Sequence, residues 1–452
     1  MDHIAIAGGG LVGCVAATYL VRRGLPVTVY ERGPDLRVST PVGRPSINLT
    51  LCERGLGPLR QIGAEADVQR LLSPAHGRIV HLEGGQCTYQ PYGEPGQAIY
   101  SVRRNELNAA LVDVAERNGV SFRFNHRWVD VDRETHELIV EEHGVPHREP
   151  AACVIAADGC FSSVRSHLER SKRLNYSQQF WTNGYKELQI PTVSNEPALS
   201  QGALHLWPRD KIMAIAFPNS DGTFSCALHM PFSGEVSFAA LKDQQSFQTV
   251  METNFPDLLP LIAPPGAAFF DTEPNSMVTI RCNPWSFDGF FLLIGDAAHS
   301  IFPSYGQGAN AGFEDCAILD RLIEVHGSDW PKVFREFELA RRADTDAIAE
   351  LCSQHFAELS DHVADPGFQR RNRVEQKLHR MFPREFSSLY SMVTFTTMPY
   401  SQAWKRSQAQ RELVDRLLEE NGIEEKLDSE EVRAQLRAAL KPSNFRRRNR
   451  AV

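Results

Sequence analysis

A chain of 452 residues is long enough for two or three domains, each with its own hydrophobic core. Its composition, 42% hydrophobic and 23% charged, is ordinary for a soluble globular enzyme. The net charge of -8 gives nucleic-acid binding no overall electrostatic support. A local exception is the basic run at 445–450, which is typical of a solvated tail and could touch an anionic membrane surface.

The nine cysteines are scattered singly, without a CxxC pair or a Cys/His cluster at zinc spacing. This pattern fits a reducing, cytoplasmic location, and we expect no metal site. Residues 4–21 are apolar and glycine-rich but lack the basic segment that begins a signal peptide. No stretch reaches roughly 18 uninterrupted apolar residues, so we expect no membrane span.

Residues 1–33 predict a strand, a helix and a second strand, with glycines at the first turn. Gly8 would allow the tight turn, and Gly10 would let backbone amides approach a pyrophosphate. Gly13 would let the helix pack closely on the strand, and Glu31 ends the second strand where an acidic residue binds a ribose hydroxyl. The pattern predicts a dinucleotide site but suits a nicotinamide and a flavin equally.

The following elements continue the alternation of strands and helices. Residues 101–119 predict a helix with one apolar face, and SFRFNH at 121–126 predicts a short strand. The segment 153–168 predicts a buried strand that ends at Asp158-Gly159 and leads into a helix. Asp-Gly after a strand is also a common turn, so this pair on its own supports a turn as well as a site.

The sequence pattern changes near residue 175, where alternating segments predict a mainly antiparallel sheet. We expect this region to bind the substrate. A buried strand returns and ends at Gly295-Asp296, and the chain beyond about 330 is mostly helical, with LYSMVTF at 389–395 interrupting the helices. We therefore expect an α/β fold. Its parts are a discontinuous Rossmann-like domain (1–174 and 286–330), an inserted β-sheet region (175–285) and a helical C-terminal region (331–452).

Three separated motifs narrow the choice of cofactor: GGGLVG at 8–13, AADG at 156–159 and GDAAHSIFPSYGQGANAGFED at 295–315. Together they resemble those of the class A flavoprotein aromatic hydroxylases. The resemblance implies that the first motif binds the ADP part of FAD and that the second lies where flavin and NADPH meet. The third would hold the ribityl chain and the flavin ring, with a helix N-terminus stabilising negative charge on the reduced ring.

The resemblance also implies individual cofactor residues. Asp296 would accept hydrogen bonds from ribityl hydroxyls, and Arg104, otherwise a surface arginine, would lean toward the FAD phosphates. The implied FAD-binding set is Gly8, Gly10, Val12, Gly13, Glu31, Arg32, Thr50, Arg104, Val129, Asp158, Asp296, Gly308, Ala309 and Asn310.

A narrower resemblance, running from residue 1 to about 410, is to the kynurenine 3-monooxygenase family. It is carried by GRPSINLTL, FNHR, NYSQQF, NGYKELQIP, ALHLWPR and YSMVTF, at 43–51, 124–127, 175–180, 183–191, 203–209 and 390–395. The resemblance implies hydroxylation of L-kynurenine to 3-hydroxykynurenine with FAD, NADPH and O₂, through a flavin C4a-hydroperoxide, in tryptophan catabolism. The implied partners are small molecules, and the oligomeric state stays open.

The same resemblance implies a pocket for the substrate carboxylate. Arg78 matches the family's carboxylate-binding arginine, whose planar fork a lysine cannot reproduce. Tyr92 and Tyr390 match the two tyrosines that complete the pocket, although a surface charge and two core aromatics are the plainer alternatives. We expect no side-chain nucleophile, and we interpret His205 and His299 as structural because the sequence identifies no Ser or Cys partner for them.

The chain departs from the family at two places. His355 stands where the family has an asparagine, and a histidine there could still bind a carboxylate in a pH-dependent way. Beside the flavin, Ser304, Tyr305 and Ala309 replace the usual aromatic pair and methionine, which should reshape the pocket near the substrate ring.

Other functions stay open on the sequence. One is a hydroxylase of a substituted kynurenine or another aromatic acid in a secondary pathway. A cofactor-binding regulatory protein without turnover and a plain nicotinamide dehydrogenase are further alternatives.

Overall fold

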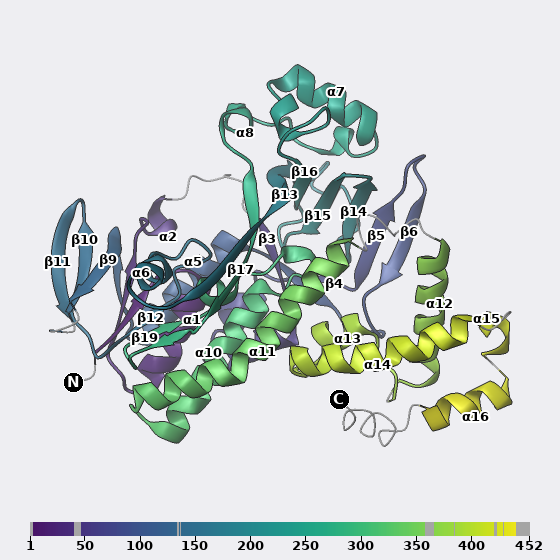
Figure 1. Cartoon of the computed structure of the whole chain (residues 1–452). Helices are drawn as coiled ribbons and strands as arrows, with labels where there is room; N and C mark the ends of the chain where they lie inside the picture. The colour runs from purple at the N-terminus through teal and green to yellow at the C-terminus, as the bar shows by residue number, and fades with distance from the viewer. Residues whose placement is uncertain are drawn as a thin grey trace.

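The computed structural model describes residues 3–39, 47–132, 135, 137–357, 366–383, 385–419, 423–427 and 429–439. Two large sheets form its framework, with helices α10 and α11 running diagonally across the middle of the molecule (Figure 1). These two helices span Gly308–His326 and Trp330–Ala357.

The six-stranded sheet has the order β18-β19-β12-β1-β2-β8, and its strands are parallel except for the edge strand β18. Its strands span Ser286–Phe287, Phe291–Leu293, Cys153–Ala156, Ile4–Ala7, Val27–Glu31 and Ser121–Phe124, in that order. β1, β12 and β19 are buried along their whole length, as expected for apolar strands covered on both faces. The predicted discontinuous Rossmann-like domain is confirmed, because strands from three distant segments pair here.

Helices α1, α5 and α10 pack together beside this sheet, and a small antiparallel sheet lies at its other side near α6. Helices α1, α5 and α6 span Leu11–Arg22, Arg104–Arg117 and Ser163–Ser171. The small sheet comprises β9 (His126–Asp132), β10 (Glu137–Glu142) and β11 (Val145–Pro150). The remaining short helices are α2 (Leu36–Ser39), α3 (Glu53–Gln61), α4 (Glu65–Gln69), α8 (Ala267–Asp271) and α9 (Asp296–His299), with 3-10 turns at Phe238–Ala240, Leu259–Leu261 and Pro303–Tyr305.

The helix predicted at 101–119 begins later than the sequence suggested. Residues Ile99–Arg103 form strand β7, and α5 starts at Arg104. β7 pairs with β3 (Asn48–Leu51) and β4 (Ser73–Ala75), and Val102 lies opposite Leu49. This long-range pairing overrides the helical periodicity, so the prediction was wrong for the first three residues.

The seven-stranded sheet has the order β17-β13-β16-β15-β14-β5-β6. Its strands span Asn275–Asn283, Asn175–Ile190, Phe224–Pro231, Ile212–Pro218, Ala203–Arg209, Gly77–His81 and Cys87–Pro91. Only the β14–β5 pair among them is parallel, so the predicted antiparallel character is confirmed. β5 and β6 come from within 1–174, so this sheet draws on more of the chain than residues 175–285. Helix α7 (Gln244–Asn254) covers one face through Phe247 and Met251.

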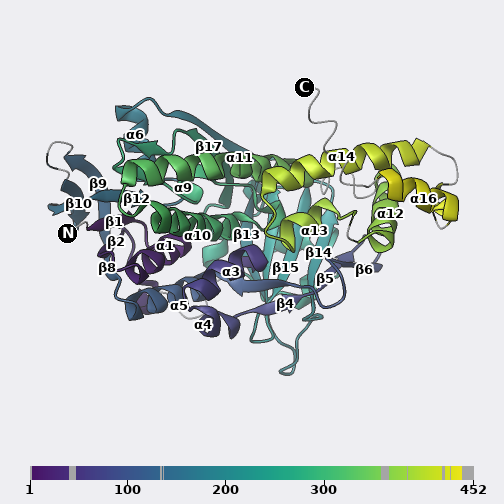
Figure 2. The same ribbon diagram turned by 90° about the horizontal axis from the view of Figure 1, so that it is seen from below.

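The C-terminal helices gather at the end of the molecule that holds the seven-stranded sheet, away from the strands of the six-stranded sheet (Figure 2). They are α12 (Pro366–Met381), α13 (Leu389–Thr394), α14 (Tyr400–Glu419), α15 (Ile423–Lys426) and α16 (Glu430–Ala439). LYSMVTF does not interrupt the helices as expected, because residues 389–394 are themselves helical and Ser388 caps them by accepting from the Ser391 amide. In the described parts of the chain, every helix is either too short or too polar to span a bilayer.

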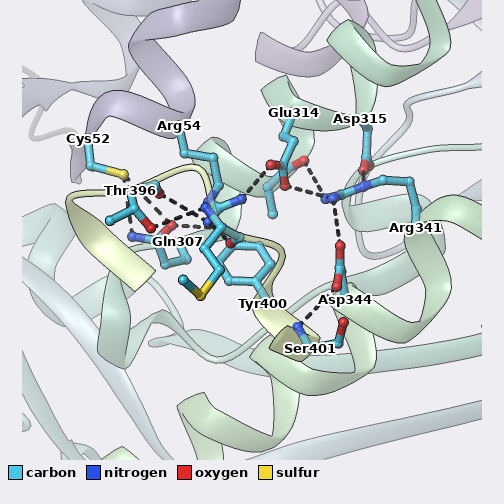
Figure 3. Close-up of polar contacts among 12 residues, drawn as sticks. Cys52, Arg54, Gln307, Glu314, Asp315, Arg341, Asp344, Thr396, Tyr400 and Ser401 are labelled. Atoms are coloured by element: carbon cyan, nitrogen blue, oxygen red, sulfur yellow. Dashed lines mark hydrogen bonds and ion pairs between the residues drawn. The ribbon is translucent and has the colours of Figure 1, made fainter. Parts of the chain in front are cut away.

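A buried ionic network joins α10 to α11 (Figure 3). Asp315 accepts from the guanidinium of Arg341 at 2.7 Å, and Arg341 also pairs with Glu314 at 2.7 Å. Both Asp315 and Arg341 are essentially without solvent exposure. Glu314 turns its other oxygen to Arg54 of α3, so one arginine on each side shares this carboxylate.

Replacing Arg341 with alanine should lower the free energy of unfolding by about 3–5 kcal/mol, because a buried carboxylate loses its cation. A denaturant titration of the purified protein measures this. The matched control is Arg342→Ala, since the Arg342 side chain is 45% exposed and its pair with Glu338 should contribute at most about 1 kcal/mol. Equal losses in the two variants would contradict a structural role for the buried network.

Candidate functional site

A cavity of about 460 Å³ opens at the carboxyl ends of β1, β2 and β12. This is the edge of a parallel sheet where α/β proteins bind nucleotides. Half of the predicted cofactor residues line the cavity: Gly8, Gly10, Glu31, Arg32, Arg104, Asp158 and Asp296.

The glycines of the first turn have distinct roles in the geometry. Gly8 has a φ of 102°, and a Cβ there would lie 2.6 Å from the carbonyl oxygen of Ala157. A Cβ at Gly13 would collide with the carbonyl oxygen of Gly8, which explains why the helix can approach the strand so closely. A Cβ at Gly10 would meet none of the described atoms within 4 Å and would project into the cavity.

Glu31 lies in the cavity wall, where its carboxylate closes the glycine turn. Oε2 accepts from the Gly9 amide at 2.7 Å, and Oε1 accepts from the Gly33 amide at 2.8 Å. Each oxygen has a further lone pair, so the carboxylate retains the capacity to accept from a ribose hydroxyl.

Asp158 and Asp296 follow neighbouring strands and both enter the cavity wall. Burial raises the pKa of each carboxyl, and for Asp296 the guanidinium of Arg104 opposes that rise. One oxygen of Asp158 accepts from the Ser163 amide at 2.7 Å and from the Val164 amide at 3.2 Å. Its other oxygen, Oδ1, is buried and has no hydrogen-bond partner among the described residues. A ligand hydroxyl in the cavity would supply the hydrogen-bond donor that Oδ1 of Asp158 needs.

Helix α10 begins at Gly308 beside the β3 strand. The Asn310 side chain accepts from the Cys52 amide at 3.0 Å and donates to the carbonyl oxygens of Thr50 and Gly306, each at 2.9 Å. Gly306 has a φ of 63°, and a Cβ there would collide with the Thr50 hydroxyl. Asn310 and Thr50 thus fix the position of the helix start. The first backbone hydrogen bond of α10 runs from the Ala311 amide to the Gln307 carbonyl, so the amides of Gly308 and Ala309 have no acceptor within the helix.

Thr50, Gly308, Ala309 and Asn310 lie at the start of α10 and not in the cavity wall, and three further predicted cofactor residues lie outside both places. Val12 packs against Gly295 and Gly312, where any side chain would press on its methyl groups. Gly13 lies beneath the turn, and Val129 is on β9 with 38% of its surface exposed.

Three of the four predicted substrate residues, Arg78, Tyr92 and Tyr390, lie close together although 312 positions of sequence separate the first from the last. The rings of Tyr92 and Tyr390 stack with centroids 5.4 Å apart, and the ring of Tyr305 also stacks on Tyr390, with centroids 5.9 Å apart. Burial raises the pKa of Tyr92 to about 12, and Arg78 opposes that rise. Burial also raises the pKa of Tyr390, and Arg78 again acts in the opposite sense. Both phenols therefore stay protonated donors close to the Arg78 guanidinium.

Arg78 is on β5, and its Nε donates to the Gln90 side chain of β6 at 2.7 Å. This bond leaves the guanidinium's outer nitrogens as the groups available to a ligand. Ser304 donates to the Cys352 carbonyl at 2.8 Å and so ties the loop before α10 to α11. The backbone of His355 belongs to α11, but its side chain lies outside the described part of the structure.

Sequence reasoning missed two residues that shape the site. Asn108 of α5 donates to the Gly9 carbonyl at 3.1 Å and supports the glycine turn from below. Gln307 is buried at the start of α10, where it accepts from the Tyr400 hydroxyl at 2.8 Å. Gln307 belongs to the motif GQGAN, so the sequence did single out this residue, but not its hydrogen-bond partner Tyr400.

Comparisons with known proteins agree with this geometry. A family model described as an FAD binding domain matches residues 2–328. The solved structure of 2-methyl-3-hydroxypyridine-5-carboxylic acid oxygenase has the same fold, with a TM-score of 0.67 at 20% identity over 81% of this chain and 95% of that one. Fold and pocket together define an FAD-dependent flavoprotein.

Two curated relatives make the assignment narrower. The kynurenine 3-monooxygenase of Christiangramia forsetii is 42% identical and covers 97% of this chain and 98% of its own. The kynurenine 3-monooxygenase of Myxococcus xanthus is 40% identical and covers 98% of this chain and 96% of its own. The chain belongs to the kynurenine 3-monooxygenase family and is an FAD-dependent aromatic monooxygenase.

The residues present fit FAD on three structural grounds. Gly10 leaves open space where a pyrophosphate must approach the backbone. Oδ1 of Asp158 can accept a hydrogen bond from a ligand hydroxyl. The backbone amides at the start of α10 can donate to an anionic ring.

Gly10→Val should remove most of the bound FAD while leaving the fold intact. The new side chain projects into the cavity and not into protein atoms, and the change at a helix N-cap should cost about 1 kcal/mol of unfolding free energy. Flavin absorbance per protein chain measures the occupancy.

The matched control is Gly202→Val, because Gly202 likewise has no described atom within 4 Å of its would-be Cβ but is not among the residues that line the cavity. Undiminished flavin in Gly10→Val would contradict the assignment of this turn to the cofactor.

Proposed function

We propose that the protein hydroxylates L-kynurenine to 3-hydroxykynurenine with NADPH and O₂, as a step of tryptophan catabolism. The observation that carries the proposal is the convergence of Arg78, Tyr92 and Tyr390. An arginine fork beside two phenol donors is complementary to an amino-acid carboxylate. The family relationship supplies the substrate class.

The side chains act by binding and orientation. Arg78 and the two tyrosines hold the carboxylate end of the substrate, so that the aminophenyl ring is directed toward the start of α10. The stacked rings of Tyr390 and Tyr305 exclude water from that path. Bound FAD would supply the redox chemistry, with electrons from NADPH and the transferred oxygen atom from O₂, so the chain needs no nucleophile of its own.

The cofactor would be held by the cavity residues described above. Gly8, Gly10 and Arg104 face the phosphates, Glu31 the ribose, and Asp296 the ribityl chain. The amides that begin α10 stabilise negative charge on the ring system. A cytoplasmic location remains a prediction, and it suits nine free thiols.

A second candidate substrate is a substituted kynurenine or a related aromatic acid. Tyr305 favours it, because its ring stacks on Tyr390 and so lies at the pocket for the substrate. A phenol at this position would contact the substrate ring and favour a polar substituent.

Product analysis after incubation with L-kynurenine, NADPH and air decides between the two. We expect 3-hydroxykynurenine in a yield close to the NADPH consumed. NADPH consumption that accelerates with L-kynurenine but gives little hydroxylated product would favour the related substrate, and no acceleration by any aromatic amino acid would contradict the proposal.

Arg78→Lys should raise the KM for L-kynurenine roughly ten- to a hundredfold, because losing a charge-assisted bond in a buried pocket costs about 1.5–3 kcal/mol. Flavin occupancy should be unchanged. Arg148→Lys, on an exposed guanidinium of the small sheet, is the matched control and should leave KM unchanged. A wild-type KM in Arg78→Lys would remove Arg78 from the substrate site.

A further inference from the structure

A chain of hydrogen bonds links a cysteine to two histidines on the edge of the seven-stranded sheet. Cys87 of β6 lies directly opposite His81 of β5, with Sγ 3.4 Å from Nδ1 of the ring. Nε2 of His81 lies 2.9 Å from Nδ1 of His205, and Nε2 of His205 lies 3.0 Å from the Ser200 carbonyl oxygen. None of these groups lines the cofactor cavity.

The direction of this chain follows from its last member. A carbonyl oxygen only accepts, so His205 must donate from Nε2. Burial lowers the pKa of His205 to about 4, so the ring is neutral and its Nδ1 accepts. His81 must then donate from Nε2, which leaves its own Nδ1 as an acceptor aimed at the Cys87 thiol.

The surroundings of His81 suit a ring that gains and loses a proton. Its ring stacks on Trp207 at 4.1 Å, and the Asp257 carboxylate lies 3.8 Å from Nδ1. Arg209 donates to the His81 carbonyl at 2.8 Å and shares Asp257 with Trp207. Burial lowers the pKa of His81, the Asp257 carboxylate raises it and the Arg209 guanidinium lowers it further. Because the net shift is downward, the His81 ring is neutral near pH 7 and can act as a base.

Cys87 differs from the other cysteines in exposure. It is exposed, Cys160 is half-buried and the remaining seven are buried. The base is therefore paired with the thiol that solvent reaches most easily.

We propose that Cys87 is a nucleophilic thiol that forms mixed disulfides with low-molecular-weight disulfides, with His81 as its base and His205 as the residue that orients His81. His81 takes the proton from Cys87 as the sulfur attacks one sulfur of the disulfide. A new S–S bond forms, the old S–S bond breaks, and the departing thiolate takes the proton back from His81. One disulfide and one thiol are consumed and one of each is produced, so no other oxidant is needed.

This proposal goes beyond the monooxygenase function and does not depend on it. No partner of His205 could be identified from the sequence, and the structure supplies His81 only because β14 and β5 pair across more than a hundred residues.

The test uses the FAD-loaded full chain and oxidised glutathione as the probe, with the labelled peptide identified by mass spectrometry. We expect Cys87 to be the main site, and Cys87→Ser to lose that label. Near pH 7 the wild type should react at least about tenfold faster than His81→Gln. The two rates should converge near pH 10, where an unassisted thiol, with a pKa of about 8.5, is already ionised.

His147→Gln, the same change at an exposed histidine of the small sheet, is the matched control and should react like the wild type. Equal rates for wild type and His81→Gln near pH 7, or labelling mainly at Cys160, would overturn the proposal. Should His81→Gln fail to fold, the wild-type profile alone decides. A nearly flat rate between about pH 6.5 and 8 supports the base, and a tenfold fall per pH unit contradicts it.

Discussion

A carboxylate with no solvent exposure is stable only where donors surround it, and Asp315 has three. It accepts from the Gly295 amide at 2.9 Å, from His299 at 2.6 Å and from Arg341 at 2.7 Å. Burial would raise the pKa of Asp315, yet His299 and Arg341 together lower it below its ordinary value. The charge is thereby kept, and it holds the turn that ends β19. Asp296 occupies its position in the cofactor cavity because this turn is fixed.

The same network extends from the cofactor domain to the C-terminal helices. Glu314 links Arg341 to Arg54, and Arg54 donates to the carbonyl oxygens of Thr396 and Met398, just beyond α13 (Figure 3). Tyr390 is in α13, so the wall of the proposed substrate pocket is anchored to α10, the helix whose N-terminus we propose to hold the flavin ring. One set of buried charges therefore positions both halves of the site.

The sequence predicted those features that local chemistry determines. The glycine turn, the buried strands and the Gly-Asp turn each depend on residues within a few positions of one another, and they lie where they were expected. The strand at Ile99–Arg103, the helix at Leu389–Thr394 and the recruitment of β5 and β6 to the second sheet depend on distant partners, so periodicity could not reveal them. The family resemblance predicted that Tyr92 and Tyr390 share a pocket, but not that their rings and that of Tyr305 stack. No pattern in the sequence indicated that Asn108 binds the Gly9 carbonyl.

We infer that the buried ionic network couples the cofactor site to the segment from Leu389 to Ser401, so that the two parts become more ordered together. Amide hydrogen exchange, measured with and without FAD, tests it most directly. We expect FAD to slow exchange in the glycine turn and in 296–312, and equally in the segment from Leu389 to Ser401 that Arg54 and Tyr400 connect to α10. Slower exchange confined to the glycine turn and the ends of β2 and β12, with 389–401 unchanged, would contradict it.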